Sequence, residues 1–131
     1  MRALVVACSL VLAACASRGG IPPRPYDDVP VPPRWTPYSR EWLRIETPTV
    51  TATKLIYFSE TGVDATLGEA RDLLVREGWT ETRSERFVNP EKFPGVWADF
   101  AKDADSCRVT VIEGNHATHV DYTLARVNRS P

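Results

Sequence analysis

The sequence DATLGEARDLLVREGW, residues 64–79, decides the fold class, because its periodicity predicts one kind of element. Its apolar residues recur at three- and four-residue spacing and form one stripe along a helix: Leu67, Ala70, Leu73 and Leu74. Asp64 stands where a side chain can cap the first turn. Gly78 is typical of the left-handed residue after a helix, and Trp79 follows where a capping hydrophobic contact is expected. We therefore predict an amphipathic helix that packs by one face on a sheet.

Strands are predicted on both sides of this helix. Before it, Trp42, Leu43 and Ile45 indicate a short strand that stops at Pro48, and residues 50–58 are rich in β-branched and aromatic side chains. After it, three or four strands are expected from segments in which apolar and polar residues alternate between turns: 79–88, 96–102, 108–112 and 118–127. Short turns between sequential strands favour antiparallel pairing. We therefore predict an α+β domain with an antiparallel sheet of about five strands, one helix packed on one face, and the order β-β-α-β-β-β.

The N-terminus has the pattern of a secretory signal peptide. Arg2 supplies a positive charge, residues 3–12 form an apolar run, and Ala13 and Ala14 supply small side chains. The run is about half as long as the roughly 20 residues that a helix needs to cross a bilayer. We therefore expect this segment to be removed.

The stretch Leu12-Ala13-Ala14-Cys15 resembles the lipobox of bacterial lipoproteins. The resemblance implies that the Cys15 sulfur receives a diacylglycerol, that the signal is cut just before Cys15, and that fatty acids such as palmitate acylate the new N-terminus. Two or three acyl chains, at about 0.8 kcal/mol per buried methylene, make a stable anchor. The alternative is an ordinary signal-peptidase cut after Ala16, because residues 14–16 also fit the A-x-A pattern.

Ala16 also bears on localisation. In lipoproteins of two-membrane bacteria, an aspartate after the cysteine often signals retention in the inner membrane, and this chain has an alanine there. The resemblance therefore implies an outer-membrane lipoprotein that faces the periplasm, with the inner membrane and the cell surface as alternatives.

A proline-rich segment follows the cysteine. Residues 21–37 hold seven of the eleven prolines, which fix φ and bias the preceding residues to extended geometry. We expect a signal peptide over 1–14, a lipidated cysteine with a semi-rigid tether over 15–37, and a folded domain over 38–131. Fully extended, residues 16–37 would reach roughly 65 Å. Docking of the proline motifs into an aromatic-lined groove or on the cell wall is the alternative.

Net charge and cysteine content bear on the classes of partner and on the disulfides that this chain can have. The formal net charge is −1, and loss of Arg2 with the signal makes it −2, so we expect no nucleic-acid partner. Cys8 leaves with the signal and Cys15 carries lipid, which leaves Cys107 without an intramolecular disulfide partner. We expect Cys107 to be a small buried apolar residue, with a reactive or intermolecular role as the alternative.

The residues most able to form a polar site lie near the last predicted strand. His119 and Asp121 share one face of that strand, and His116 and Glu113 lie in the preceding turn. A zinc site needs three or four converging ligands, and nothing distant in sequence offers a further one. We therefore interpret these residues as the solvated face of the sheet and predict no metal or cofactor. With neither a G-x-S-x-G elbow nor a Gly-rich phosphate loop, we predict no catalytic residue.

Trp97 is a candidate for a binding contact. If Val96, Ala98 and Phe100 face the core, Trp97 points away from it and is a contact for a partner. If the register is shifted by one residue, Trp97 is part of the core. The loop before this strand leaves both registers open.

The helix that ends in Glu77-Gly78-Trp79 before a run of hairpin strands is similar to the small domains of outer-membrane assembly accessory lipoproteins. The resemblance implies a periplasmic domain and assigns no functional residue. We hypothesise a membrane-anchored lipoprotein that acts as a structural or protein-interaction module of the cell envelope, with an unidentified envelope protein as partner. The alternatives are a domain that binds a small ligand, lipid or metal, and a cryptic enzyme.

Overall fold

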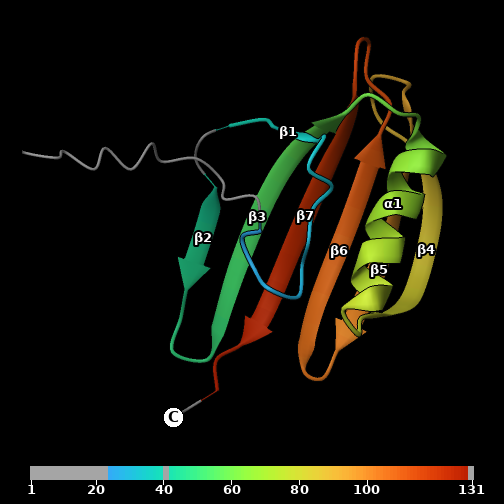
Figure 1. Cartoon of the computed structure of the whole chain (residues 1–131). Helices are drawn as coiled ribbons and strands as arrows, with labels where there is room; N and C mark the ends of the chain where they lie inside the picture. Colours follow the sequence, from blue (N-terminus) through green and yellow to red (C-terminus); the bar gives the residue numbers. More distant parts are fainter. Residues whose placement is uncertain (1–23, 40–41, 130–131) are drawn as a thin grey trace, which may run out of the picture.

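The computed structural model describes residues 24–39 and 42–129, and within these ranges the chain forms one antiparallel sheet of seven strands and one helix (Figure 1). The elements in chain order are β1 (Thr36–Pro37), β2 (Leu43–Glu46), β3 (Val50–Ser59), α1 (Val63–Arg76), β4 (Thr80–Val88), β5 (Pro94–Lys102), β6 (Asp105–Ile112) and β7 (Thr118–Val127). The strands lie in the order β1-β3-β7-β6-β5-β4, and β2 also pairs with β3. Because β7 occupies one edge of β3 along its whole length, β1 and β2 share the other edge. No helix in the described ranges is long and apolar enough to cross a membrane.

The predicted strand number and order are wrong. Seven strands in the order β-β-β-α-β-β-β-β replace about five in the order β-β-α-β-β-β. The additional strand before the helix is β1, which comes from the proline-rich segment and pairs with Tyr57 and Phe58 of β3. So short a strand forms through its distant partner and leaves no alternating pattern in its own sequence. After the helix, each of the four alternating segments forms a strand.

The connection from β3 to β4 crosses the width of the sheet. β3 lies near one edge and β4 lies at the other, so the chain between them must pass over β7, β6 and β5. Within this connection α1 lies on one face of the sheet, roughly along the strands (Figure 1), where it contacts β4, β5, β6 and β7. From β4 the chain returns strand by strand until β7 pairs with β3. The first long strand, β3, and the last strand, β7, are therefore neighbours in the sheet.

The apolar stripe and the end of the helix match the sequence prediction. Three of the four stripe residues are buried, Leu67, Ala70 and Leu74, and Leu73 is half-buried. Gly78 has a φ of +89°, which favours glycine. The Trp79 backbone N–H then donates to the Leu74 carbonyl over 3.0 Å, and the Trp79 ring is buried.

Asp64 does not cap the helix. The N-cap is Gly62, and no side chain forms a capping hydrogen bond there. Asp64 lies within the first turn, where its carboxylate contacts the Arg86 guanidinium of β4 over 2.5 Å. A negative charge in the first turn still interacts favourably with the helix dipole. The ion pair also joins α1 to the edge strand β4.

A second element covers the sheet beside α1: residues 24–39, here called the strap (blue and cyan in Figure 1). Val29 of the strap is fully buried and Trp35 is only 4% exposed. The spacer expected over 15–37 is therefore docked on the domain from residue 24 onward. The expected signal peptide over 1–14, and the tether as far as residue 23, lie outside the described residues.

Trp35 holds the strap against both the sheet and the helix. Its ring lies against Tyr57 of β3 and Tyr122 of β7, with centroids 6.3 and 6.2 Å apart. Its indole N–H donates to a carboxylate oxygen of Glu69 on α1 over 3.1 Å. The core is thus enclosed on this face by two elements side by side, the helix and the strap.

Candidate interaction face

The other side of the sheet, here called the open face, is covered by no element among the described residues. Side chains alternate along each strand, and the alternate set that packs under α1 and the strap is buried in β3, β5, β6 and β7. Cross-strand partners share a face, which assigns the remaining set to the open face. Its aromatic, leucine and isoleucine members are Tyr38, Leu43, Ile45, Ile56, Phe58, Phe87, Trp97 and Ile112.

One row of the open face runs across five strands. Phe58 of β3 is paired with His119 of β7, which is paired with Ile112 of β6. Ile112 is paired with Gly95 of β5, and Gly95 with Phe87 of β4. The rings of Phe58 and His119 meet edge to face at 4.7 Å between centroids. The row is therefore a continuous strip of apolar and aromatic surface.

Gly95 makes room for an aromatic ring in this row. A Cβ atom at this position would lie 2.6 Å from the Phe87 Cζ atom, closer than side chains tolerate. The ring of Phe87 therefore lies over the glycine, where it covers backbone that would otherwise be exposed.

Trp97 lies on the open face in the row next to this strip. Val96, Ala98 and Phe100 are at most 5% exposed, which selects the register that points Trp97 away from the core. The guanidinium carbons of Arg108 and Arg83 lie 4.1 and 5.1 Å from the centre of its ring. At these distances both cations attract the ring face, so the indole is packed against two arginine side chains.

The charges around Trp97 are already paired. The Arg108 guanidinium donates two hydrogen bonds to the Asp99 carboxylate, over 2.6 and 2.8 Å. The hydrogen bond from Arg108 lowers the pKa of Asp99 and raises that of Arg108. Arg83 contacts Glu85 over 2.9 Å. The surroundings of the indole therefore carry little net charge and offer a rigid aromatic surface.

The structure does not bring the histidines and Asp121 into one site. His119 packs on Phe58, Asp121 pairs with Lys54 of β3 over 2.8 Å, and His116 lies in the turn between β6 and β7. Within the described ranges, no group of three or more His, Cys, Asp or Glu residues is placed to hold a metal ion. His119 and Asp121 lie on the open face, as the sequence predicted.

A cavity of about 580 Å³ lies at the N-terminal end of α1. The loop from β3 to α1 and the turn from β6 to β7 form its walls, and Glu113 and His116 contribute from that turn. Arg86 also lines it but is engaged by Asp64. The cavity is large enough for a small ligand, although its charged lining is mixed in sign.

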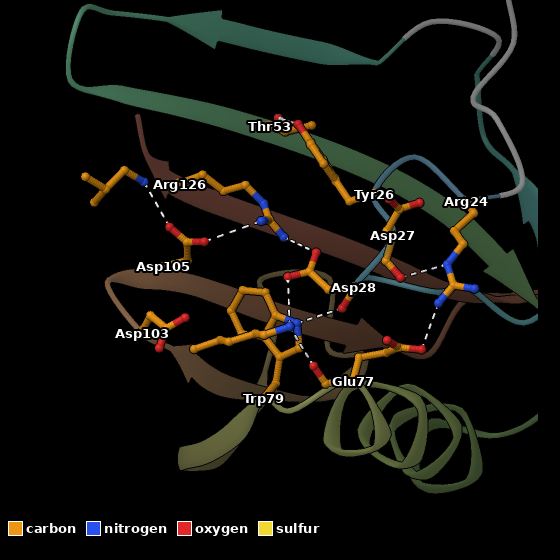
Figure 2. A network of polar contacts seen from close by, with 12 residues as sticks. Arg24, Tyr26, Asp27, Asp28, Thr53, Glu77, Trp79, Asp103, Asp105 and Arg126 are labelled. Atoms are coloured by element: carbon orange, nitrogen blue, oxygen red, sulfur yellow. Dashed lines mark hydrogen bonds and ion pairs between the residues drawn. The ribbon is translucent and has the colours of Figure 1, made fainter. Parts of the chain in front are cut away.

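A network of charged residues fastens the start of the strap to the sheet (Figure 2). The Asp28 carboxylate pairs with Arg126 of β7 and accepts a hydrogen bond from Lys102 of β5 over 3.3 Å. Arg126 also contacts Asp105 of β6 over 3.4 Å. The Asp28 carbonyl accepts a hydrogen bond from the Trp79 indole over 2.7 Å. One strap residue thus contacts two strands, β5 and β7, and the tryptophan that follows the helix.

The burial and mutual pairing of these charged side chains indicate a structural role. They are one-third exposed or less, so that each charge depends on its partners. The Arg126 guanidinium carbon also lies 4.9 Å from the Tyr26 ring centre, which holds the strap from a second side. This network was not predicted from the sequence. The apolar residues Val29 and Trp35 among the prolines were the local sign that the segment packs on the domain.

Cys107 is buried on β6 at 1% exposure and is a free cysteine, which confirms its predicted burial. Desolvation raises the pKa of its thiol to about 12. The nucleophilic thiolate is therefore scarce at neutral pH. The predicted lipid attachment at Cys15 lies outside the described residues.

Comparisons with known proteins place the chain in no family. No family model and no curated protein matches it. Among solved structures, it is similar to the crystal structure of the "Protein of Unknown Function PA94 from Pseudomonas aeruginosa, Putative Regulator", with 17% identity and a TM-score of 0.48. The match covers 64% of this chain and 66% of that chain, just under two thirds of its length. So distant a likeness carries no argument about function.

Proposed function

We propose that this protein is a lipid-anchored protein of the bacterial cell envelope whose domain binds a protein partner through the open face. The anchor is proposed on the resemblance of residues 12–15 to a lipobox. The observation that carries the binding proposal is the aromatic strip beside Trp97 on a sheet whose opposite side is already enclosed. Catalysis is no part of this proposal.

The chemistry of the open face favours a protein over other partners. Aromatic residues and arginine are enriched at the centres of protein interfaces, and Trp and Arg dominate their energetics. The cations Lys54, Arg83 and Arg108 each pair with a carboxylate on the same face. Such a face does not attract a polyanion, and it fits a partner surface that is itself apolar at its centre and polar at its rim.

A site-specific crosslink tests the binding face. A photoreactive amino acid at Thr123, exposed on the open face of β7, is expected to yield a discrete adduct with one envelope protein, identified by mass spectrometry. The matched control is the same amino acid at Val75, 53% exposed on the helix. Trp97→Ala in the Thr123 chain is expected to abolish the adduct. An adduct from Val75 alone, or one that survives Trp97→Ala, contradicts the proposal.

The anchor has its own test. Cys15→Ser is expected to leave an unprocessed precursor and to abolish labelling by a fatty-acid probe. Normal cleavage of the variant to a soluble form would instead support the ordinary cut after Ala16.

A small-ligand function is the second candidate, and the cavity of about 580 Å³ is the observation that favours it. Native mass spectrometry of the purified protein tests it directly. A defined small molecule that is lost on Gly62→Trp, which fills the mouth of the cavity, together with no protein adduct from the open face, would favour this candidate.

A further inference from the structure

We propose that β2 is the edge through which two copies of this chain pair, with the two β2 strands antiparallel about a two-fold axis at Ile45. This inference goes beyond the proposed function and does not depend on the lipid anchor or on the open face. It rests on three features of β2: a free edge, the direction of its backbone groups, and a sequence that is complementary to itself.

The outer edge of β2 is free among the described residues. β2 pairs only with β3, and all four of its residues are exposed. Leu43 and Ile45 are 59% and 54% exposed, which is unusual for large aliphatic residues in a strand. Unpaired N–H and C=O groups at such an edge are a template for another strand.

The edge strand at the other end of the sheet, β4, is protected against pairing with a further strand, whereas β2 is not. β4 has a register shift between Glu81 and Arg83, and such a bulge twists an edge away from further pairing. β2 has neither a bulge nor a proline.

The hairpin from β2 to β3 fixes which backbone groups of β2 point outward. The Thr47 N–H donates to the Val50 carbonyl over 2.9 Å, and the Val50 N–H donates to the Thr47 side-chain hydroxyl over 3.0 Å, so this pair occupies a hydrogen-bonded position of the hairpin. In an antiparallel ladder, hydrogen-bonded and non-hydrogen-bonded pairs alternate. Ile45 therefore directs its backbone groups to β3, whereas Arg44 and Glu46 direct theirs to the free edge.

The outward groups and the side chains match those of a second copy. Centring two antiparallel β2 strands on Ile45 places Arg44 of each copy opposite Glu46 of the other. These two pairs supply the outward backbone hydrogen bonds, and each joins opposite charges on one face, a favourable cross-strand pair. In the single chain the Arg44 and Glu46 side chains contact each other over 2.5 Å, so pairing exchanges one such contact within each copy for two contacts between the copies.

The two copies of Ile45 meet at the axis. They form a non-hydrogen-bonded pair, in which the Cα atoms approach to about 4.5 Å and the side chains are closest. The axis is perpendicular to the sheet, so both open faces lie on the same side of one continuous sheet. A pair of four-residue strands buries far less than the roughly 1,200 Å² of a stable interface. The association is therefore weak and forms at high protein concentration.

Cysteine crosslinking at Ile45 tests the axis in the full chain. A Cα separation of about 4.5 Å suits a disulfide, so Ile45→Cys is expected to give a disulfide-linked dimer under mild oxidation. Leu43→Cys is the matched control on the same face of the same strand. The two Leu43 residues would lie four positions apart along the pair, or about 13 Å, beyond the range of a disulfide. The unsubstituted chain gives the background from its own cysteines.

Charge reversal tests the register independently. Arg44→Glu and Glu46→Arg, each in the Ile45→Cys chain, place like charges opposite each other twice and are expected to lower the yield of dimer about threefold or more. The double reversal restores both pairs and the yield. Lys92→Glu, an exposed reversal in the turn after β4, is expected to leave the yield unchanged.

Three outcomes would overturn the inference. Equal crosslinking from Leu43→Cys and Ile45→Cys would show random collision. A double reversal that stays as low as the single reversals would exclude this register. A disulfide adduct with a different protein, in place of the dimer, would show that the edge takes a strand from a partner of another sequence.

Discussion

Replacing Trp35 by alanine is expected to lower the free energy of unfolding by about 3 to 5 kcal/mol, the usual range for a buried tryptophan. The ring is 4% exposed and packs against Tyr57 and Tyr122. The loss is large beside the 5 to 15 kcal/mol that stabilise a typical domain. If the strap were only a spacer, the same substitution would change stability by less than about 0.5 kcal/mol.

Trp35→Phe separates packing from hydrogen bonding. It keeps an aromatic ring and removes the indole N–H that donates to Glu69 over 3.1 Å. Hydrogen bonds to charged groups contribute about 1.5 to 3 kcal/mol, and we expect the lower end because Glu69 also pairs with Arg34. This variant keeps the test valid if Trp35→Ala fails to fold.

Urea denaturation followed by far-ultraviolet circular dichroism is the appropriate assay, because it does not depend on the fluorescence of the residue removed. Tyr38→Ala is the matched control, since Tyr38 belongs to the same strap but is 61% exposed. Its contact with Phe58 limits the expected loss to about 1 kcal/mol. Equal losses from Trp35→Ala and Tyr38→Ala would refute the reasoning that the strap belongs to the core.

Three further predictions concern single groups. Burial raises the pKa of Cys107 to about 12, so the Cys107 peptide is expected to resist alkylation at pH 8 in the folded protein and to react in urea. Gly95→Ala places a Cβ 2.6 Å from Phe87 and is expected to cost about 1 to 3 kcal/mol by thermal denaturation, which Phe87→Ala relieves. The hydrogen bond from Arg108 lowers the pKa of Asp99, so the pair stabilises the fold above the unfolded-state pKa and this contribution is lost as pH falls through the folded-state pKa. Arg108→Ala is expected to move the carboxyl titration of Asp99, followed by NMR, back to higher pH.

The helix could be predicted from the sequence because its causes are local. A 3.6-residue period needs only its own stripe, and a glycine of positive φ ends the helix by its own backbone. The orientation of Trp97 followed from alternation once its neighbours were known to be buried. The sequence left the register of the strand around Trp97 open, because the turns that flank a strand help to set its register.

The strap could not be predicted because its causes are distant. Prolines fix local geometry, but they do not say whether an extended segment lies on a protein or in water. That choice depends on a groove built by β3, β7 and α1, and on Asp28 meeting Arg126, 98 positions away. Val29, Pro32 and Trp35 are the buried residues of the strap. The missed β1 has the same origin, because its two residues become a strand only by lying against β3.

The docked strap changes what the proposed anchor does. As a spacer from Cys15, the proline-rich segment would hold the domain roughly 65 Å from the lipid. Because the strap is fastened from Arg24 onward, only nine residue steps separate Cys15 from the domain, and these span at most about 30 Å. The proposed lipid would therefore keep the domain near the membrane surface. Confinement to that layer raises the local concentration of the domain, and this favours an association as small as the proposed β2 pairing over what the same strands achieve in solution.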